Sequence, residues 1–195
     1  MPAVKKTGFF SGVLPVVFAV AFVCGPATAK SPPQRGDRLP AINLPVPENE
    51  AERDYLGLSE GKRFQISQIK ADAVIIEIFS MYCPVCQNAA PRVNALYEAI
   101  EKGGMKGRIK LIGIGANNNT FEVTYFKKTY HIPFPLFPDG EMTIYSALGG
   151  EIRTPYFIAF KIDQKGGSDI FYTQTGGFEN VDDFLHSIIK EAGLK

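Results

Sequence analysis

An apolar run of the sequence ends just before a pair of cysteines, and a helical pattern begins at the second of them. Residues 74–79 read Val-Ile-Ile-Glu-Ile-Phe, a β-branched stretch of the length expected for a buried central strand. From Cys86 to about Lys102 apolar residues recur at helical spacing, and Gly103-Gly104 ends the pattern. Cys83 and Cys86 are therefore predicted to lie where a buried strand meets the start of a helix.

The rest of the chain predicts an alternation of strands and helices. Strands are expected at 109–114, 156–162 and 169–175 with a short extended piece at 134–137, and helices at 120–130, 143–148 and 181–192. Because the alternation ends in two adjacent strands, we predict an α/β fold with helices on both faces of a sheet and an antiparallel edge pair. With 195 residues, of which 45% are hydrophobic, the chain favours one domain with short extensions.

The first 29 residues have the pattern of a secretory signal. Lys5 and Lys6 precede an apolar stretch over about residues 9–23, and Ala27-Thr28-Ala29 provides the small residues that a signal peptidase needs. The apolar stretch is shorter than a membrane-spanning helix, which needs about 20 apolar residues. We therefore expect export to the periplasm with cleavage of the leader. Two alternatives remain, an uncleaved membrane anchor and lipidation at Cys24.

Behind the leader, the sequence predicts an arm and one folded domain. Residues 30–50 are rich in proline and polar residues, so we expect a tether and an irregular arm there, followed by the domain at 51–195. The whole chain has a net charge of +1, and without Lys5 and Lys6 it has 19 basic against 20 acidic residues, with no basic run. A nucleic-acid partner is therefore not indicated.

Three cysteines are present, and removal of the leader would take Cys24 and leave Cys83 and Cys86. Disulfides persist in exported proteins, but a bond between such close neighbours closes a very small loop and adds little stability. Reactivity explains the pair better. Free N–H groups and the dipole at a helix start favour a thiolate, which is the nucleophile in disulfide exchange. We expect Cys83 to attack a substrate disulfide and Cys86 to resolve the mixed disulfide, and Pro84 suits the first helical turn between them.

Two other roles of the cysteine pair remain open, a zinc site and an inert disulfide. A structural zinc ion needs four ligands, and the chain without its leader offers two cysteines, His131 and His186, which lack paired spacing. We therefore predict no metal and no cofactor other than the redox-active Cys83–Cys86 disulfide. His131 is expected to cap the end of a helix and His186 to lie on the surface, so neither is predicted to serve Cys83 in a hydrolase.

The residues from Ile75 to Pro91 resemble the thioredoxin superfamily, and more narrowly its exported TlpA-like and ResA-like thiol–disulfide oxidoreductases. Tyr82 precedes the first cysteine, where the family usually has a tryptophan. Pro91 follows the first cysteine by eight residues, and Glu77 precedes it by six, as in the family. The pair Thr154-Pro155 before a predicted strand matches the family's cis-proline. The resemblance covers about residues 36–194 and implies a thioredoxin-like fold with a central mixed sheet and a central insertion.

The position of Glu77 in an apolar strand also predicts a role in proton transfer. Burial in an apolar strand raises the pKa of a carboxyl group because the charged form is poorly solvated. Such a group beside two thiols is expected to shuttle the proton that Cys86 loses. The alternative is a strand residue that simply faces water.

A substrate-binding surface is expected around Tyr82, Pro84, Thr154 and Pro155. Pro155 has no N–H and leaves the neighbouring backbone open, and in relatives the residue before the cis-proline, here Thr154, bonds an extended substrate backbone. The alternatives are a trans proline at the start of a strand and a Tyr82 side chain that only packs.

The function expected from these features is reduction of disulfides in exported proteins. The resemblance implies protein disulfides or dithiols as substrates and a membrane protein as electron donor, with cytochrome c maturation as one role in this branch, and we expect a monomer. A peroxiredoxin-like peroxidase is an alternative. Its site needs a Thr or Ser three residues before the reactive cysteine, which Ser80 provides, and a proline seven residues before it, where this chain has Ile76. A copper-binding module like the Sco proteins is another, although those have one more residue between their cysteines.

Overall fold

The computed structural model describes residues 1–3, 8, 31–162 and 167–195 of the chain. Most of the predicted leader, including Cys24, lies outside these residues. Within them, no helix combines the length and the apolar character needed to cross a membrane.

A five-stranded mixed sheet forms the centre of the fold, in the order β5-β4-β3-β6-β7. Its strands are β3 (Ala73–Phe79), β4 (Ile109–Ala116), β5 (Leu136–Asp139), β6 (Tyr156–Ile162) and β7 (Ser168–Thr175). The pairs β3–β4 and β4–β5 are parallel, whereas β3–β6 and β6–β7 are antiparallel. All seven residues of β3 are buried, as expected for a strand with neighbours on both sides and layers on both faces.

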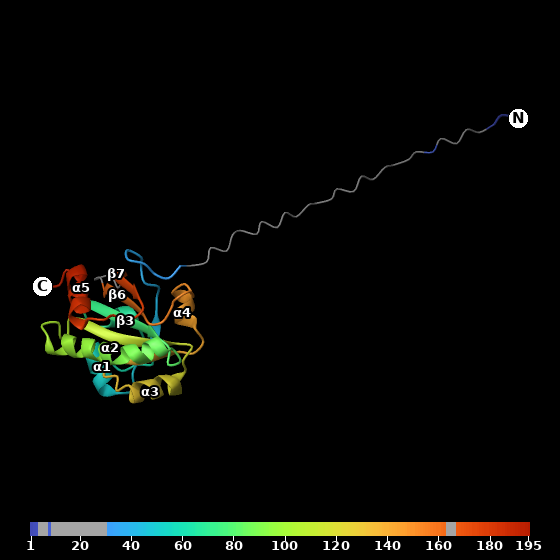
Figure 1. Ribbon diagram of the computed structural model, residues 1–195. Helices are drawn as coiled ribbons and strands as arrows, with labels where there is room; N and C mark the ends of the chain where they lie inside the picture. Colours follow the sequence, from blue (N-terminus) through green and yellow to red (C-terminus); the bar gives the residue numbers. More distant parts are fainter. Residues whose placement is uncertain (4–7, 9–30, 163–166) are drawn as a thin grey trace.

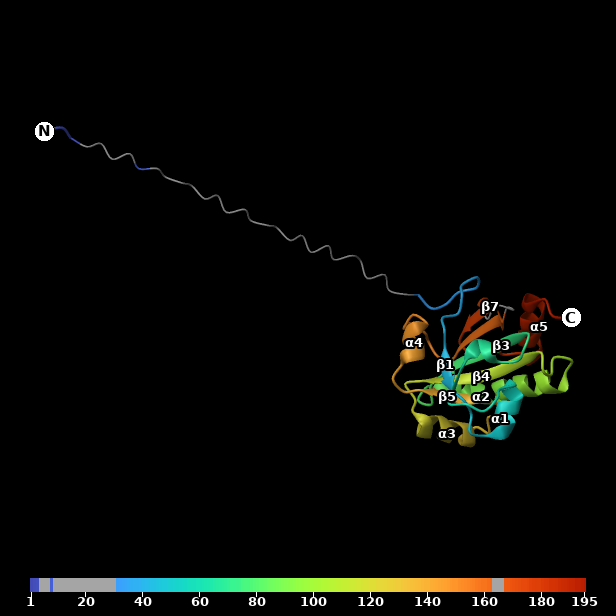
Figure 2. The same cartoon turned by 180° about the vertical axis from the view of Figure 1, so that it is seen from behind.

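Helices and the N-terminal segment cover the two faces of this sheet. The helices are α1 (Glu50–Leu56), α2 (Pro84–Lys102), α3 (Thr120–Thr129), α4 (Thr143–Ala147) and α5 (Val181–Ala192). Ile75 and Phe79 pack into a core with α2, α3 and α5, whereas Ile76 and Ile78 pack into a second core with the N-terminal segment. Figure 1 shows α2 and α5 on one side of the sheet, and Figure 2 shows β1 over the other side. This arrangement confirms the predicted α/β class.

Part of the segment expected to be an irregular arm is built into the domain. Strand β1 (Asn43–Pro45) pairs antiparallel with β2 (Arg63–Gln65), and a 3-10 turn follows at Ile66–Gln68. Leu39, Ile42 and Leu44 are buried in the second core. These elements have too few residues to produce a recognisable periodicity, so composition alone suggested a tether.

The segment between β4 and β6 contributes α3, the edge strand β5 and α4. A capping box starts α3, because the Asn119 side chain accepts from the backbone N–H of Glu122 while the Glu122 side chain accepts from that of Asn119. Since β3 and β4 are parallel, the helices that follow them, α2 and α3, both begin at the carboxyl edge of these strands. This topology brings the starts of two helices together at one end of the sheet.

Candidate active site at the carboxyl edge of the sheet

Three segments that are distant in sequence meet at this edge. The loop between β3 and α2 carries the cysteine motif, and the loop between β4 and α3 lies beside it. Strand β6 runs antiparallel to β3, with Tyr156 opposite Ile78, so the Thr154-Pro155 pair that precedes β6 reaches the same edge. The edge therefore combines the cysteine motif with the proline that the resemblance had paired with it.

Cys83 is the N-cap residue of α2, and Pro84 occupies the first helical position. This is the position in which proline costs least, because its missing N–H would have no partner within the helix. Cys83 and Cys86 are both free thiols, the first half-buried and the second buried. The Cys83 Sγ lies 3.4 Å from the carbonyl oxygen of Thr154, to which the thiol donates.

The surroundings of Cys83 favour its thiolate. Partial burial by itself raises the pKa of this thiol. Hydrogen bonds outweigh the effect of burial, and they come from the Thr154 side chain, from the backbone and side chain of Cys86, and from the Val85 backbone. The pKa of Cys83 therefore lies below its ordinary value of 9.0. The free N–H groups of the first helical turn thus act on the sulfur as expected from the sequence.

Cys86 has the opposite character. Burial raises the pKa of its thiol far above the ordinary value. A hydrogen bond with the Ser80 backbone lowers this pKa, whereas the hydrogen bond with Cys83 and the charges of Glu77 and Cys83 raise it further. Its side chain is fully shielded from solvent within the α2 core. One thiol is therefore poised to ionise while the other keeps its proton.

Glu77 is buried, with 3% of its surface exposed, and so does not face water. Because side chains alternate along a strand, it points to the same face as Ile75 and Phe79, which is the face covered by α2. Burial and, secondly, the charge of Cys83 raise its pKa to about 8. A carboxyl group that titrates near neutral pH thus interacts electrostatically with both thiols.

The residues predicted to bind substrate are placed as follows. The Thr154–Pro155 peptide bond is cis, with Pro155 buried and Thr154 half-buried next to Cys83. Pro84 is exposed at the start of α2. Tyr82 is 61% exposed, and its hydroxyl donates a hydrogen bond to the Glu122 carboxylate. The Tyr82 side chain is thus fixed at its polar end, while most of its surface is open to solvent.

Sequence reasoning missed the residues that hold the active-site loop. The side chain of Asn118, which is fully buried, accepts a hydrogen bond of 2.8 Å from the backbone N–H of Met81. The Gln87 side chain donates a bond of 2.7 Å to the carbonyl oxygen of Met81. The strand predicted at 109–114 and the helix predicted at 120–130 leave Asn118 in the segment between them. Its position directly before that helix was the one available signal in the sequence.

No metal site accompanies the cysteines in the part of the chain that the structure describes, where no group of three or more His, Cys, Asp and Glu side chains is arranged to hold an ion. His131 follows the last turn of α3, at the end opposite to Glu122, and has a positive φ of 52°. His186 lies within α5.

The sequence is similar to a known protein family and to thiol-disulfide oxidoreductases. A family model described as Redoxin matches residues 34–187. The thiol-disulfide oxidoreductase ResA of Halalkalibacterium halodurans is 27% identical over 135 residues, which are 68% of this chain and 72% of that protein. ResA of Bacillus thuringiensis subsp. konkukian is 27% identical over 112 residues, 55% of this chain and 58% of that protein.

Solved structures share the fold at lower identity. A thiol:disulfide interchange protein of the thioredoxin family from Chlorobium tepidum has a TM-score of 0.56 at 20% identity, covering 83% of this chain and 99% of that chain. A secreted disulfide oxidoreductase of Mycobacterium tuberculosis, described as homologous to DsbE of E. coli, has a TM-score of 0.54 at 15% identity, covering 76% and 95% of the two chains. These likenesses confirm the thioredoxin-like fold.

Proposed function

The chain belongs to the Redoxin family and is a thiol–disulfide oxidoreductase, and we propose that it reduces disulfides of exported proteins with Cys83 as the nucleophile and Cys86 as the resolving thiol. The observation that carries this proposal is the asymmetry of the two thiols. Cys83 is accessible and has a lowered pKa, whereas Cys86 is buried and has a raised one. An attacking thiol must be ionised and reachable, while a resolving thiol must stay protonated until the mixed disulfide exists.

The reaction proceeds in two exchanges. The Cys83 thiolate attacks one sulfur of the substrate disulfide, forms a new S–S bond with it and releases the other substrate sulfur as a thiolate, which takes up a proton. Cys86 then loses its proton and attacks the Cys83 Sγ. The Cys83–Cys86 disulfide forms and the second substrate thiolate leaves, so that two electrons have passed from the protein to the substrate.

In this scheme the ionised form of Glu77 accepts the proton of Cys86. With a pKa of about 8, its carboxyl group exchanges protons near neutral pH, where an ordinary glutamate would already be fully ionised. Its place on β3, on the face that α2 covers, and the effect of its charge on the pKa of Cys86 support the role.

Substrate binds along the edge formed by Tyr82, Pro84, Thr154 and Pro155. An extended segment of substrate pairs with the backbone of Thr154, in the manner of strand addition. The contact of the Cys83 Sγ with the Thr154 carbonyl group supports this arrangement, because it puts the sulfur beside the backbone that would receive the substrate.

We further propose export to the periplasm through a signal in residues 1–29, and a membrane protein as the electron donor that regenerates the dithiol. The domain would act as a monomer. Residues 30–50 would join the leader to the domain at 51–195, and the part of this segment from Leu39 to Leu44 packs into the domain's second core. A solved structure of similar fold is described as that of a secreted oxidoreductase, which supports this location.

The experiment that tests the function is measurement of the reduction potential of the Cys83–Cys86 pair in dithiothreitol or glutathione buffers. We expect a value near that of thioredoxin, about −270 mV, which makes the protein an electron donor to exported disulfides. A value near about −120 mV would make it a disulfide donor instead and contradict the proposed direction. In parallel, Cys86→Ser should accumulate a mixed disulfide with substrate that Cys83→Ser cannot form. A wild-type pair that does not cycle would remove the function altogether.

A further inference from the structure

Exposed apolar side chains are concentrated next to the cysteine motif. Among the described residues, the large hydrophobic side chains that are mostly exposed are, apart from Met1, those of Tyr82, Val85, Phe121 and Tyr125. Tyr82 and Val85 flank the start of α2, while Phe121 and Tyr125 lie in the first two turns of α3. Exposed aromatic groups gathered in one place are typical of an interaction surface.

Contacts between the two helix starts join these four residues into one surface. The Tyr82 hydroxyl donates to Glu122, the residue next to Phe121, and the Met81 N–H donates to Asn118 in the loop before α3. Phe121 and Tyr125 are four residues apart and so share one side of α3. The opposite side of this helix is buried through Val123 and Phe126, which leaves the two aromatic rings directed outward.

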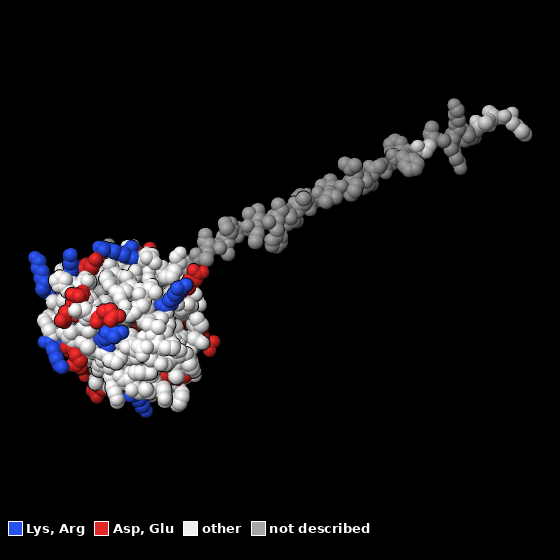
Figure 3. Space-filling view, in the orientation of Figure 1, with Lys and Arg blue, Asp and Glu red and all other residues white. Residues whose placement is uncertain are grey.

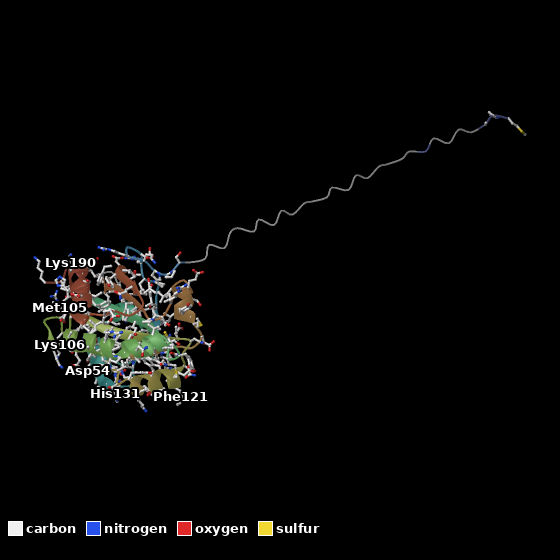
Figure 4. All side chains as sticks on the ribbon, viewed as in Figure 1. Asp54, Met105, Lys106, Phe121, His131 and Lys190 are labelled. Atoms are coloured by element: carbon white, nitrogen blue, oxygen red, sulfur yellow. The ribbon has the colours of Figure 1, made fainter. Side chains whose placement is uncertain are left out.

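The surface carries little charge. Figure 3 shows charged side chains gathered over the left and upper parts of the molecule, while the lower right part, over the starts of α2 and α3, is largely uncharged. Figure 4 places Phe121 at this end of α3, with His131 at the other. The carboxylate of Glu122 accepts from the Tyr82 hydroxyl and from the Asn119 N–H, so its hydrogen-bonding capacity is engaged within the protein.

We propose that Tyr82, Val85, Phe121 and Tyr125 form a docking surface for apolar residues that flank the disulfide cysteine of an extended partner polypeptide. This inference rests on the proposed function and adds to it the class of substrate. The surface continues directly from the thiol that meets the substrate, and an extended chain advances about 3.3 Å per residue. Residues a few positions from the substrate cysteine therefore reach α3, and the uncharged aromatic surface favours apolar side chains there.

The test compares two peptides that each carry one cysteine in a mixed disulfide with glutathione. In the first peptide Leu and Phe flank the cysteine, and in the second Ser and Gly do. The pre-reduced protein is mixed with each peptide in stopped-flow, and the second-order rate constants are compared for the wild type, for Phe121→Ser/Tyr125→Ser and for the control Thr124→Ser/Lys128→Ser. The control places the same two serines on exposed positions of the same helix.

We expect the wild type to reduce the apolar peptide about tenfold faster than the polar one, as partial burial of one or two large apolar side chains implies. The ratio should fall close to one in Phe121→Ser/Tyr125→Ser and stay near ten in the control. Equal rates for the two peptides in the wild type, or an unchanged ratio in the aromatic variant, would overturn the docking surface alone. Failure to reduce either peptide would overturn the proposed function as well.

Two other occupants of the surface have distinct signatures. If it joined two copies of the chain, sedimentation would show a dimer that the aromatic variant loses. If it met a lipid surface, the wild type would sediment with anionic phospholipid vesicles and the aromatic variant would not. Either result would overturn the assignment to a partner polypeptide, whereas a monomer that does not bind vesicles and retains the tenfold peptide preference supports it.

Discussion

Replacement of Glu77 by glutamine should remove a large pH dependence of stability. Burial and the charge of Cys83 raise the pKa of Glu77 from 4.5 to about 8 in the folded, reduced protein. Between these values the folded state holds a proton that the unfolded chain has lost. The stability that this group contributes is therefore complete below the unfolded pKa of 4.5 and is lost as the pH rises through about 8. With about 1.4 kcal/mol per pKa unit, Glu77 should lower the free energy of unfolding by about 4 kcal/mol between pH 5 and pH 9.

The assay is urea unfolding of the reduced wild type and of Glu77→Gln at pH 5, 7 and 9. The introduced amide side chain is neutral at every pH, so the difference between the two free energies of unfolding should grow in favour of the variant by about 4 kcal/mol over this range. Titrating groups that do not interact with Glu77 cancel in the difference. Glu122→Gln is the matched control, because the pKa of this surface carboxyl is lowered by the hydrogen bonds from Tyr82 and Asn119, so its difference from the wild type should stay constant above pH 5. A constant difference for Glu77→Gln as well would refute the raised pKa.

Three further predictions test the thiols, the loop and the N-terminal segment. Iodoacetamide should alkylate Cys83 with a pH midpoint below 9.0 and leave Cys86 unmodified at pH 8 in the native protein, as read by peptide mass mapping; equal labelling would contradict the asymmetry. Asn118→Ala should lower the free energy of unfolding by about 1–3 kcal/mol, because an N–H of the active-site loop loses its buried acceptor, and an unchanged urea midpoint would contradict this. Leu44→Ala should cost about 2–5 kcal/mol in the same assay, and Asn43→Ala beside it about 0.5 kcal/mol or less; equal small effects would mean that this segment is not part of the core.

The parts of the fold that the sequence predicted well have long, uninterrupted patterns. β3 was expected at 74–79 and lies at Ala73–Phe79, and α5 was expected and found at 181–192. In both, the apolar pattern extends over the whole element: it is continuous along the buried strand and recurs at helical spacing along the helix. By contrast, α1 has seven residues, and β1 and β2 have three each. Such short elements are stabilised by packing against the rest of the domain, which a local sequence pattern does not show.

The same distinction holds in the candidate site. Cys83, Cys86 and Glu77 could be found because one strand and one helix start fix their spacing. Asn118 and Glu122 could not, because their bonds to the active-site loop join residues 37 and 40 positions apart. Such contacts depend on β3 and β4 being parallel neighbours in the sheet, which no local sequence pattern shows.

In the proposed reaction, the charges of the site order the proton transfers in time. The charge of Cys83 is one of the causes that raise the pKa of both Glu77 and Cys86. When Cys83 forms the mixed disulfide its sulfur becomes neutral, so this contribution disappears and both groups ionise more readily. Before the attack Cys86 is held protonated, and it cannot displace a substrate that has not yet bound. We infer that formation of the mixed disulfide itself prepares Cys86 for the resolving step, with Glu77 positioned to take the proton that is then released.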